Sequence, residues 1–279
     1  MSEPVRIRIT ADDLGWSEEV DDGIALAADA GALSAVSVLA TGPSFEHGVK
    51  VLRNRRDLSI GLHLDLTDFR AAAPRDAVST LVDGDGRFRR RSRRLVLALL
   101  LGAVRREHVE REIGAQLARL GAAGLRVRHL DGHRHAHIFP GVPAAALAAV
   151  RSLSLELAYV RVVPASSPRG VAPHALPMRT ALVALSRAFE PIFTASTTAR
   201  PSALAGLAEG HALERDWIAN AASHATSGLT EIVTHPGLET SGAVGRAASH
   251  ERATDLAALR SPALRELIAS GRAVLDRPS

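Results

Sequence analysis

Histidine and aspartate are concentrated in one short segment, residues 127–140, which reads VRHLDGHRHAHIFP and holds four of the chain's twelve histidines. If this backbone is extended, the alternate residues from His129 to His137, with Asp131 among them, point the same way. If it is helical, only His133 and His137 share a face. Imidazole and carboxylate groups bind divalent transition metals, so either geometry indicates a metal site.

Three other strand-like segments end in residues of the same kind. The segment 5–13 ends in Asp12 and Asp13, the segment 58–67 carries His63, and the segment 230–236 ends in His235 before Pro-Gly. Parallel α/β folds place their sites at the carboxyl ends of the strands. We therefore expect these side chains to meet the histidine cluster at one edge of a sheet.

Each of these residues also has a purely structural interpretation. Asp12 and Asp13 could cap a helix, His63 could be a hydrogen-bonded core histidine, and His235 could belong to a turn. For each residue alone, the structural interpretation is favoured. Because four strand ends all carry potential metal ligands, however, the set together favours a shared site. A helical HExxH zinc motif is excluded because Arg134 stands in place of the glutamate. An amidohydrolase would carry its HxH pair on the first strand, where this chain has carboxylates.

Strand-like runs alternate with Ala- and Leu-rich helical runs. Strands are expected at 5–13, 35–41, 58–67, 125–133, 157–163, 230–236 and 272–276, and helices at 19–31, 106–124, 143–153 and 261–271. This alternation predicts an α/β fold with a parallel sheet, either a barrel or a doubly wound fold. Without a repeat or a linker, residues 1–279 are expected to form a single domain. Segments 70–105 and 165–215 break the alternation and are interpreted as loop insertions.

Composition narrows the classes of function. Hydrophobic residues make up 46% of the 279 residues, and no apolar run is long enough to span a membrane. The chain has no cysteine, which excludes disulfides and thiolate sites and is compatible with the cytoplasmic location that we expect. The pI of 10.6 reflects arginine rather than a large charge excess, because the net charge is +4. With 3% aromatic residues, a nucleic-acid partner is not expected.

The basic run in residues 87–105, RFRRRSRRLVLALLLGAVR, leads into an apolar one. The favoured interpretation is a solvated arginine face followed by a helix that packs on the body. The alternative is a membrane-surface helix, or a lid over an anionic or lipid-linked substrate. Membrane association is thus not expected beyond a lid contact through this segment.

Four motifs, TADDLGWS, GLHLDLT, HLDGHRHAH and THPG, resemble in order those of the YdjC-like (ChbG/HpnK) carbohydrate deacetylases, which are similar in architecture to NodB-type polysaccharide deacetylases. The resemblance runs from residue 5 to about residue 275. It implies a distorted (β/α) barrel, TIM-like and of the deacetylase type, that holds one divalent metal ion and removes an N-acetyl group from an acetylated amino sugar or sugar conjugate. Leu14 and Gly132 depart from the commoner phenylalanine and serine of the motifs, but neither change removes a ligand.

Site residues follow from the resemblance position by position. It implies Asp13, His63 and His133 as metal ligands, Asp12 as general base, and His235 as general acid or oxyanion stabiliser. The implied substrate-binding residues are Arg161, His135 and His137. The implied metal is Mg²⁺ first, although ligand softness favours Zn²⁺, Co²⁺ or Mn²⁺. The expected partner is a small molecule or oligosaccharide bearing an N-acetyl group, and a homo-oligomer is left open.

Two alternatives stay open. The first is a metal-dependent phosphoesterase on a similar barrel, which would often use more than one metal ion. The second is a metal- or sugar-binding homologue without turnover. The second is less favoured, because a pure binder needs the ligand Asp13 but not the adjacent carboxylate of Asp12.

Overall fold

The computed structural model describes residues 4–167, 175–194, 199–207, 215–225, 228–239 and 246–278. Its strands form one parallel sheet in the order β5-β4-β3-β2-β1-β7-β6, with β8 paired to β1 outside this path. The strands are β1 Val5–Leu14, β2 Ala35–Val38, β3 Ser59–Leu64, β4 Val127–Gly132, β5 Tyr159–Val160, β6 Ala203–Ala205, β7 Leu229–Thr234 and β8 Ala273–Leu275.

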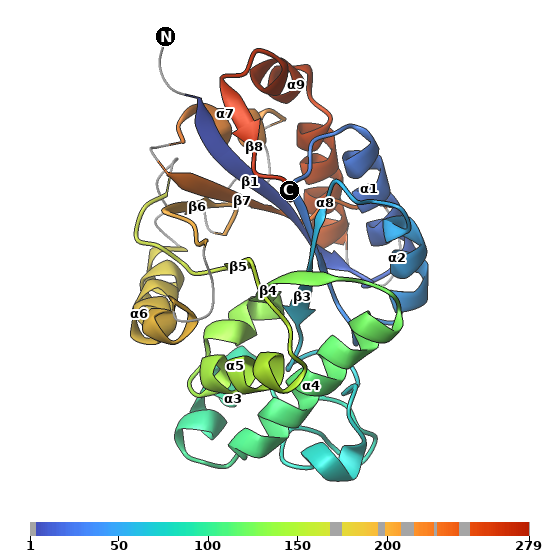
Figure 1. Cartoon of the computed structure of the whole chain (residues 1–279), viewed down its shortest axis with the longest axis vertical. Helices are drawn as coiled ribbons and strands as arrows, with labels where there is room; N and C mark the ends of the chain where they lie inside the picture. Colours follow the sequence, from blue (N-terminus) through green and yellow to red (C-terminus); the bar gives the residue numbers. More distant parts are fainter. Residues whose placement is uncertain are drawn as a thin grey trace.

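Helices connect the parallel strands and lie around the curled sheet, with α1, α2 and α8 grouped on one side and α4 and α5 beyond β3 and β4 (Figure 1). The α-helices are α1 Glu18–Asp29, α2 Phe45–Leu52, α3 Ser92–Leu100, α4 Arg106–Ala122, α5 Val142–Ser152, α6 Leu176–Thr194, α7 Trp217–Ser223, α8 Arg246–Leu259 and α9 Pro262–Ala269. Two 3₁₀ turns are η1 Arg75–Val78 and η2 His133–Ile138.

The sheet is an open, distorted barrel, as expected. Its two end strands, β5 and β6, approach each other through a parallel bridge between Tyr159 and Ala199 and a 3.2 Å hydrogen bond from the Leu204 amide to the Ser166 carbonyl. β1 lies inside the sheet between β2 and β7, and it is buried from Ile7 to Leu14. Burial on both faces of a central strand is typical of parallel sheets covered by helices.

Most of the expected elements are present, with boundaries shifted by a few residues. Segment 165–215, which we interpreted as a loop insertion, instead contributes helix α6 and strand β6 in its described part. β6 reads Ala-Leu-Ala and has no β-branched residue, so its sequence carries no strand signal. Segment 70–105 does leave the sheet and contains η1 and α3. Among the described residues, no helix is long and apolar enough to cross a bilayer.

Candidate metal centre

An irregularity near the end of β1 turns two successive carboxylates toward one site. The register between β1 and β2 shifts between Ala11 and Leu14, and Asp13 has φ 70°. In a regular strand, neighbouring side chains point to opposite faces. Here both Asp12 and Asp13 line the same cavity. The structural alternative for this pair does not apply, because the residue that caps α1 is Ser17.

His63 from β3 and His133 from the start of η2 meet Asp13. The Asp13 Oδ1 atom lies 3.0 Å from His133 Nδ1 and 3.3 Å from His63 Nε2. One donor atom from each of the three residues falls within 4.8 Å of the others. Ligand bonds of about 2.1 Å place neighbouring ligands roughly 3 to 3.4 Å apart, so this spacing suits one divalent ion.

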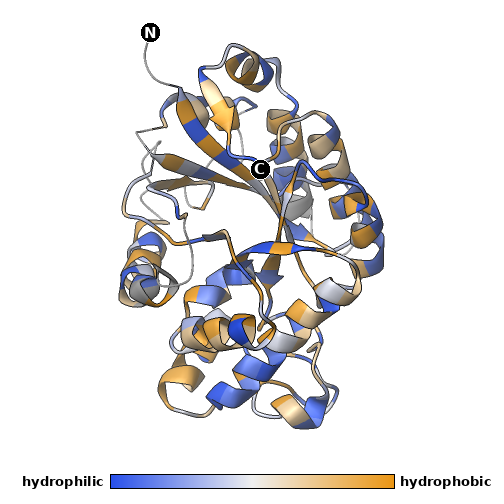
Figure 2. Ribbon diagram, viewed as in Figure 1, coloured by the Kyte–Doolittle hydropathy of each residue, from blue (hydrophilic) through white to orange (hydrophobic). Residues whose placement is uncertain are grey.

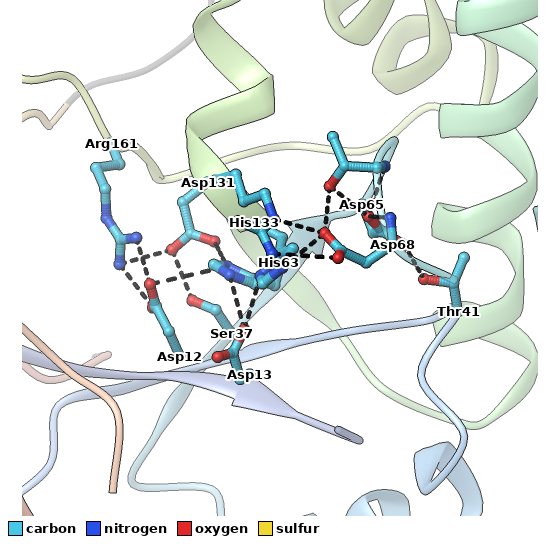
Figure 3. Close-up of polar contacts among 12 residues, drawn as sticks. Asp12, Asp13, Ser37, Thr41, His63, Asp65, Asp68, Asp131, His133 and Arg161 are labelled. Carbon is cyan, nitrogen blue, oxygen red and sulfur yellow. Dashed lines mark hydrogen bonds and ion pairs between the residues drawn. The ribbon is translucent and has the colours of Figure 1, made fainter. Parts of the chain in front are cut away.

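A second carboxylate lies on the far side of each imidazole. His63 Nδ1 lies 2.7 Å from Asp131 Oδ1, and His133 Nε2 lies 3.2 Å from Asp68 Oδ2 (Figure 3). Metal-binding histidines usually give their second ring nitrogen to such a partner, which fixes the tautomer and the ring orientation. The donor set and its supports therefore fit a metal ion.

The carboxylates also set the proton affinity of the two imidazoles. Burial alone would lower the pKa of His63, but Asp12 and Asp131 raise it to about 10. Burial alone would also lower the pKa of His133, but the nearby carboxylate of Asp13 raises it to about 9. A divalent ion and two protons therefore compete for the same nitrogens.

Arg161, from the end of β5, pairs with several buried acids beside the site. Its guanidinium contacts Asp12 at 2.7 and 2.9 Å, Asp131 at 2.8 Å and Glu231 at 3.0 Å. Its side chain is completely buried. Burial alone would raise the pKa of Asp12, but Arg161 holds it well below its usual range. Asp12 is thus an ionised carboxylate with a fixed orientation.

Arg252, from α8, pairs with the remaining oxygen of Asp13. The distance from its Nη2 atom to Asp13 Oδ2 is 2.6 Å, and its guanidinium carbon lies 5.7 Å from the centre of the Trp16 ring. Against the effect of burial, His133 and Arg252 keep the pKa of Asp13 well below its usual range. Because Arg252 lies 239 residues along the chain from Asp13, motif spacing did not reveal it.

The site opens into a cavity of about 260 Å³. It is lined by Asp12, Asp13, His63, Gly132, His133, Arg134, His135, Gly206, Leu207, Val233 and His235. Gly206 comes directly after β6, so the strand that the sequence analysis missed supplies part of the wall. Burial lowers the pKa of His235, which makes its imidazolium a stronger acid but a rarer species at neutral pH.

Arg161 and His137, two of the three residues expected to bind substrate, lie elsewhere. Neither lines the cavity, and both are fully buried. His137 Nε2 donates to the carbonyl of Arg161 at 2.9 Å. Both side chains therefore lie in the interior beside the site, Arg161 against Asp12 and His137 against the backbone of Arg161. His135 does line the cavity.

The histidine cluster adopts neither of the two regular periods considered from the sequence. β4 ends at Gly132, so His129 and Asp131 alone follow the strand period. Arg134 and His135 then take positive φ angles of 51° and 60° inside η2. His129 belongs to the interior, because its two ring nitrogens lie 3.1 and 3.0 Å from the hydroxyls of Ser37 and Ser59.

Other residues of the site had weaker signals or none. Asp131 was visible two positions before His133 on one strand face, whereas Asp68 and Glu231 looked like ordinary loop and strand residues. Ser37, which donates to Asp131 at 2.6 Å, had no distinguishing pattern.

Comparison with known proteins supports one family. The model of the family described as YdjC-like protein matches residues 6–270. A carbohydrate deacetylase of Brevibacillus brevis is 36% identical over 139 residues, which cover 50% of this chain and 52% of the relative. That of Geobacillus stearothermophilus is 37% identical over 134 residues (48% and 51%), and that of Homo sapiens is 37% identical over 147 residues (51% and 44%).

These alignments span about half the length of the curated relatives. The fold is shared over the whole chain with the crystal structure of a proposed cellobiose-phosphate cleavage protein from Enterococcus faecalis. The TM-score is 0.73 at 21% identity, and the superposition covers 99% of this chain and 98% of the other.

Proposed function

The chain belongs to the YdjC-like protein family, and on this premise we propose that it is a metal-dependent hydrolase that removes an N-acetyl group from an acetylated amino sugar or sugar conjugate. The relatives named carbohydrate deacetylases support this reaction. The single observation that carries this proposal is that Asp13, His63 and His133 lie together, with the carboxylate of Asp12 beside them but outside this ligand set.

We assign Asp13, His63 and His133 as the metal ligands. A divalent ion bound there would lower the pKa of water and attract the negative charge that develops on the acetyl oxygen. Mg²⁺ stands first by family resemblance, while two imidazole ligands favour Zn²⁺, Co²⁺ or Mn²⁺. Asp131 hydrogen-bonds the ring of His63 from the other side, and Asp68 lies 3.2 Å from the ring of His133.

Asp12 would act as the general base that takes the proton from the attacking water. Its carboxylate is ionised, lines the cavity and is held at both oxygens by Arg161. A positioned base of this kind typically contributes about 10²- to 10⁴-fold in rate. Arg161 is a positioning residue in this proposal, and so is His137, which bonds to its carbonyl.

His235 would supply a proton or a hydrogen bond to the departing nitrogen. It comes directly after β7 and lines the cavity together with Asp12. Its backbone amide donates to Asp255 at 2.8 Å, which fixes the turn that carries the ring. His135, on the same cavity, is proposed to contact the sugar.

The charge of Arg161 argues against a phosphoesterase with two metal ions. The group Asp12, His63 and Asp131 could by spacing hold a second ion. However, both of its carboxylates already bind the Arg161 guanidinium, at 2.7 and 2.8 Å. A metal-to-protein ratio near one is therefore expected, and a ratio of two would favour the phosphoesterase.

The test is acetate release from chitooligosaccharides and other N-acetylhexosamine conjugates, together with metal analysis of the purified chain. Chelation should abolish activity, and added divalent metal should restore it. Asp12→Asn should lower kcat by about 10²-fold or more while metal content is unchanged. Asp13→Asn should lose the metal as well. Asp22→Asn is the matched control, because Asp22 is exposed and, among the described residues, pairs only with His47.

Full activity in Asp13→Asn, or no metal bound to the active protein, would contradict the proposal. Tight sugar binding without acetate release would favour the non-catalytic homologue. A single domain over residues 1–279, a cytoplasmic location and a homo-oligomer stay predictions of the sequence, each open to its own measurement.

A further inference from the structure

Helix α3 stands out because its solvent side is apolar. Leu97, Leu100 and Leu101 are 57%, 66% and 72% exposed, the three highest values among large hydrophobic side chains in the described part of the chain. The helix packs on the body through Leu95 and Ala98 instead. Figure 2 shows this apolar helix at the edge of the molecule, outside the layer of helices that cover the sheet.

The exposed leucines continue a basic face of the same helix. Arg93 and Leu97 are four residues apart, and Leu100 and Leu101 follow one turn later, so all of them lie on one side. Arg93 and Arg94 are both exposed. Neither arginine makes an ion pair with a described residue, and this leaves both guanidinium groups to solvent.

The surrounding segment is strongly cationic. Residues 83–107 contain eight arginines and three carboxylates, a net charge of +5, whereas the whole chain has +4. This segment therefore holds the entire positive excess of the molecule. The exposed arginines are Arg87, Arg89, Arg91, Arg93, Arg94, Arg105 and Arg106.

We propose that this surface, formed by α3 and its flanking arginines, docks on an anionic lipid bilayer. The three leucines would enter the boundary between headgroups and acyl chains, and the arginines would bind lipid phosphates. A protein partner is less favoured, because α3 reads SRRLVLALL and lacks the aromatic anchors that carry much of the binding energy of protein interfaces. Charge complementarity favours the bilayer.

The docking surface is connected to the cavity rim through the chain. Segment 70–105 leaves the carboxyl end of β3, which carries His63. Further along, the chain comes back to the start of this segment, where the Phe88 amide donates to the Phe69 carbonyl at 3.0 Å, next to Asp68. The segment that would anchor the protein to the bilayer thus begins beside the metal centre.

The experiment is co-sedimentation of the full chain with vesicles of pure phosphatidylcholine and with vesicles that also contain phosphatidylglycerol. We expect binding to the anionic vesicles, at least ~10-fold weaker binding to neutral ones, and a decrease with salt. Leu97→Gln/Leu100→Gln/Leu101→Gln should reduce partitioning by ~10-fold or more. Arg93→Glu/Arg94→Glu tests the charge separately, and thermal melts check that each variant folds.

Matched controls change the same kinds of residue elsewhere. Leu176→Gln/Met178→Gln removes exposed apolar side chains from α6, and Arg53→Glu/Arg56→Glu reverses exposed charges near α2. Both should bind vesicles like the unmodified chain.

Equal binding to both vesicle types, no binding to either, or unchanged binding of the leucine variant would overturn the proposal. So would a self-association that the leucine variant abolishes, which would assign the surface to a second copy. Acetate release from a soluble substrate is independent of this surface, so its failure would concern the proposed reaction alone.

Discussion

Replacing Arg161 by methionine is the sharpest test of the buried charge network. The side chain is completely buried and contacts three carboxylates, those of Asp12, Asp131 and Glu231. Methionine fills a similar volume without charge. It removes the guanidinium from all three acids, while the ring of His63 still lies 2.7 Å from Asp131 and 3.9 Å from Asp12.

The expected loss of stability follows from these contacts. Removing one partner of a buried ion pair usually destabilises a protein by about 3–5 kcal/mol, because the other charge stays buried. Three acids share this arginine, so we expect at least about 4 kcal/mol at pH 7. Arg161→Lys keeps the charge but lacks the planar fork, and about half of that loss is expected.

The sign of the pH dependence separates charge from packing. In the unmodified chain Asp12 has a lowered pKa, so its stabilising contribution is present above the unfolded pKa of about 4 and disappears at lower pH. In Arg161→Met the buried Asp12 binds a proton more readily than it does unfolded. Its penalty is therefore largest at pH 7 and shrinks as the pH falls toward 4.

Urea unfolding of both variants between pH 4 and pH 8 measures these differences. The gap between Arg161→Met and the unmodified chain should narrow by about 2 kcal/mol or more from pH 7 to pH 4. In acetate release, the acid limb of the pH–rate profile should move to higher pH, because the proposed general base, Asp12, must lose its proton to act. A loss under about 1 kcal/mol, or a gap that does not change with pH, would refute this account of Arg161.

Three further predictions concern other parts of the molecule. In Gly61→Ala the new Cβ would lie 2.2 Å from the ring of His129, so we expect urea unfolding to show a loss of about 3 kcal/mol in stability. Gly84→Ala is the control and should change stability little, because no atom lies within 4 Å of its new Cβ. Equal losses in the two variants would contradict this prediction. Burial raises the pKa of Glu112 to about 7, so its contribution to stability is lost as the pH rises from 4.5 to 7. Relative to the unmodified chain, Glu112→Gln should gain up to about 3 kcal/mol between pH 5 and pH 8, and parallel pH curves would exclude this. Divalent metal at about 100 times its dissociation constant should raise the free energy of unfolding by about 2.7 kcal/mol, and a thermal-shift assay should show no such gain for Asp13→Asn.

Part of this architecture could be predicted because parallel α/β folds place their functional side chains at the carboxyl ends of the strands. His63 sits in a clear period-two run, and Asp12, Asp13 and His235 close runs of buried residues, so their convergence follows from a parallel sheet. Their positions at strand ends were enough to expect one site.

Other features depend on tertiary structure that local pattern does not encode. The turn after Gly132 takes positive φ at Arg134 and His135, which only the packed surroundings enforce. Arg252 reaches Asp13 from a distant helix. Strand β6 consists of alanine and leucine, whose preference for a strand comes from the neighbour β7 with which it pairs.

The irregular end of β1 bears on any attempt to transplant this centre into another barrel. Two adjacent acids line one pocket because the second of them, Asp13, itself takes a left-handed backbone conformation. Copying Asp12 and Asp13 onto a straight strand would send one of them into the surrounding helices. The portable unit is therefore the kinked dipeptide with Leu14 and the β2 register that accepts it, rather than the two side chains.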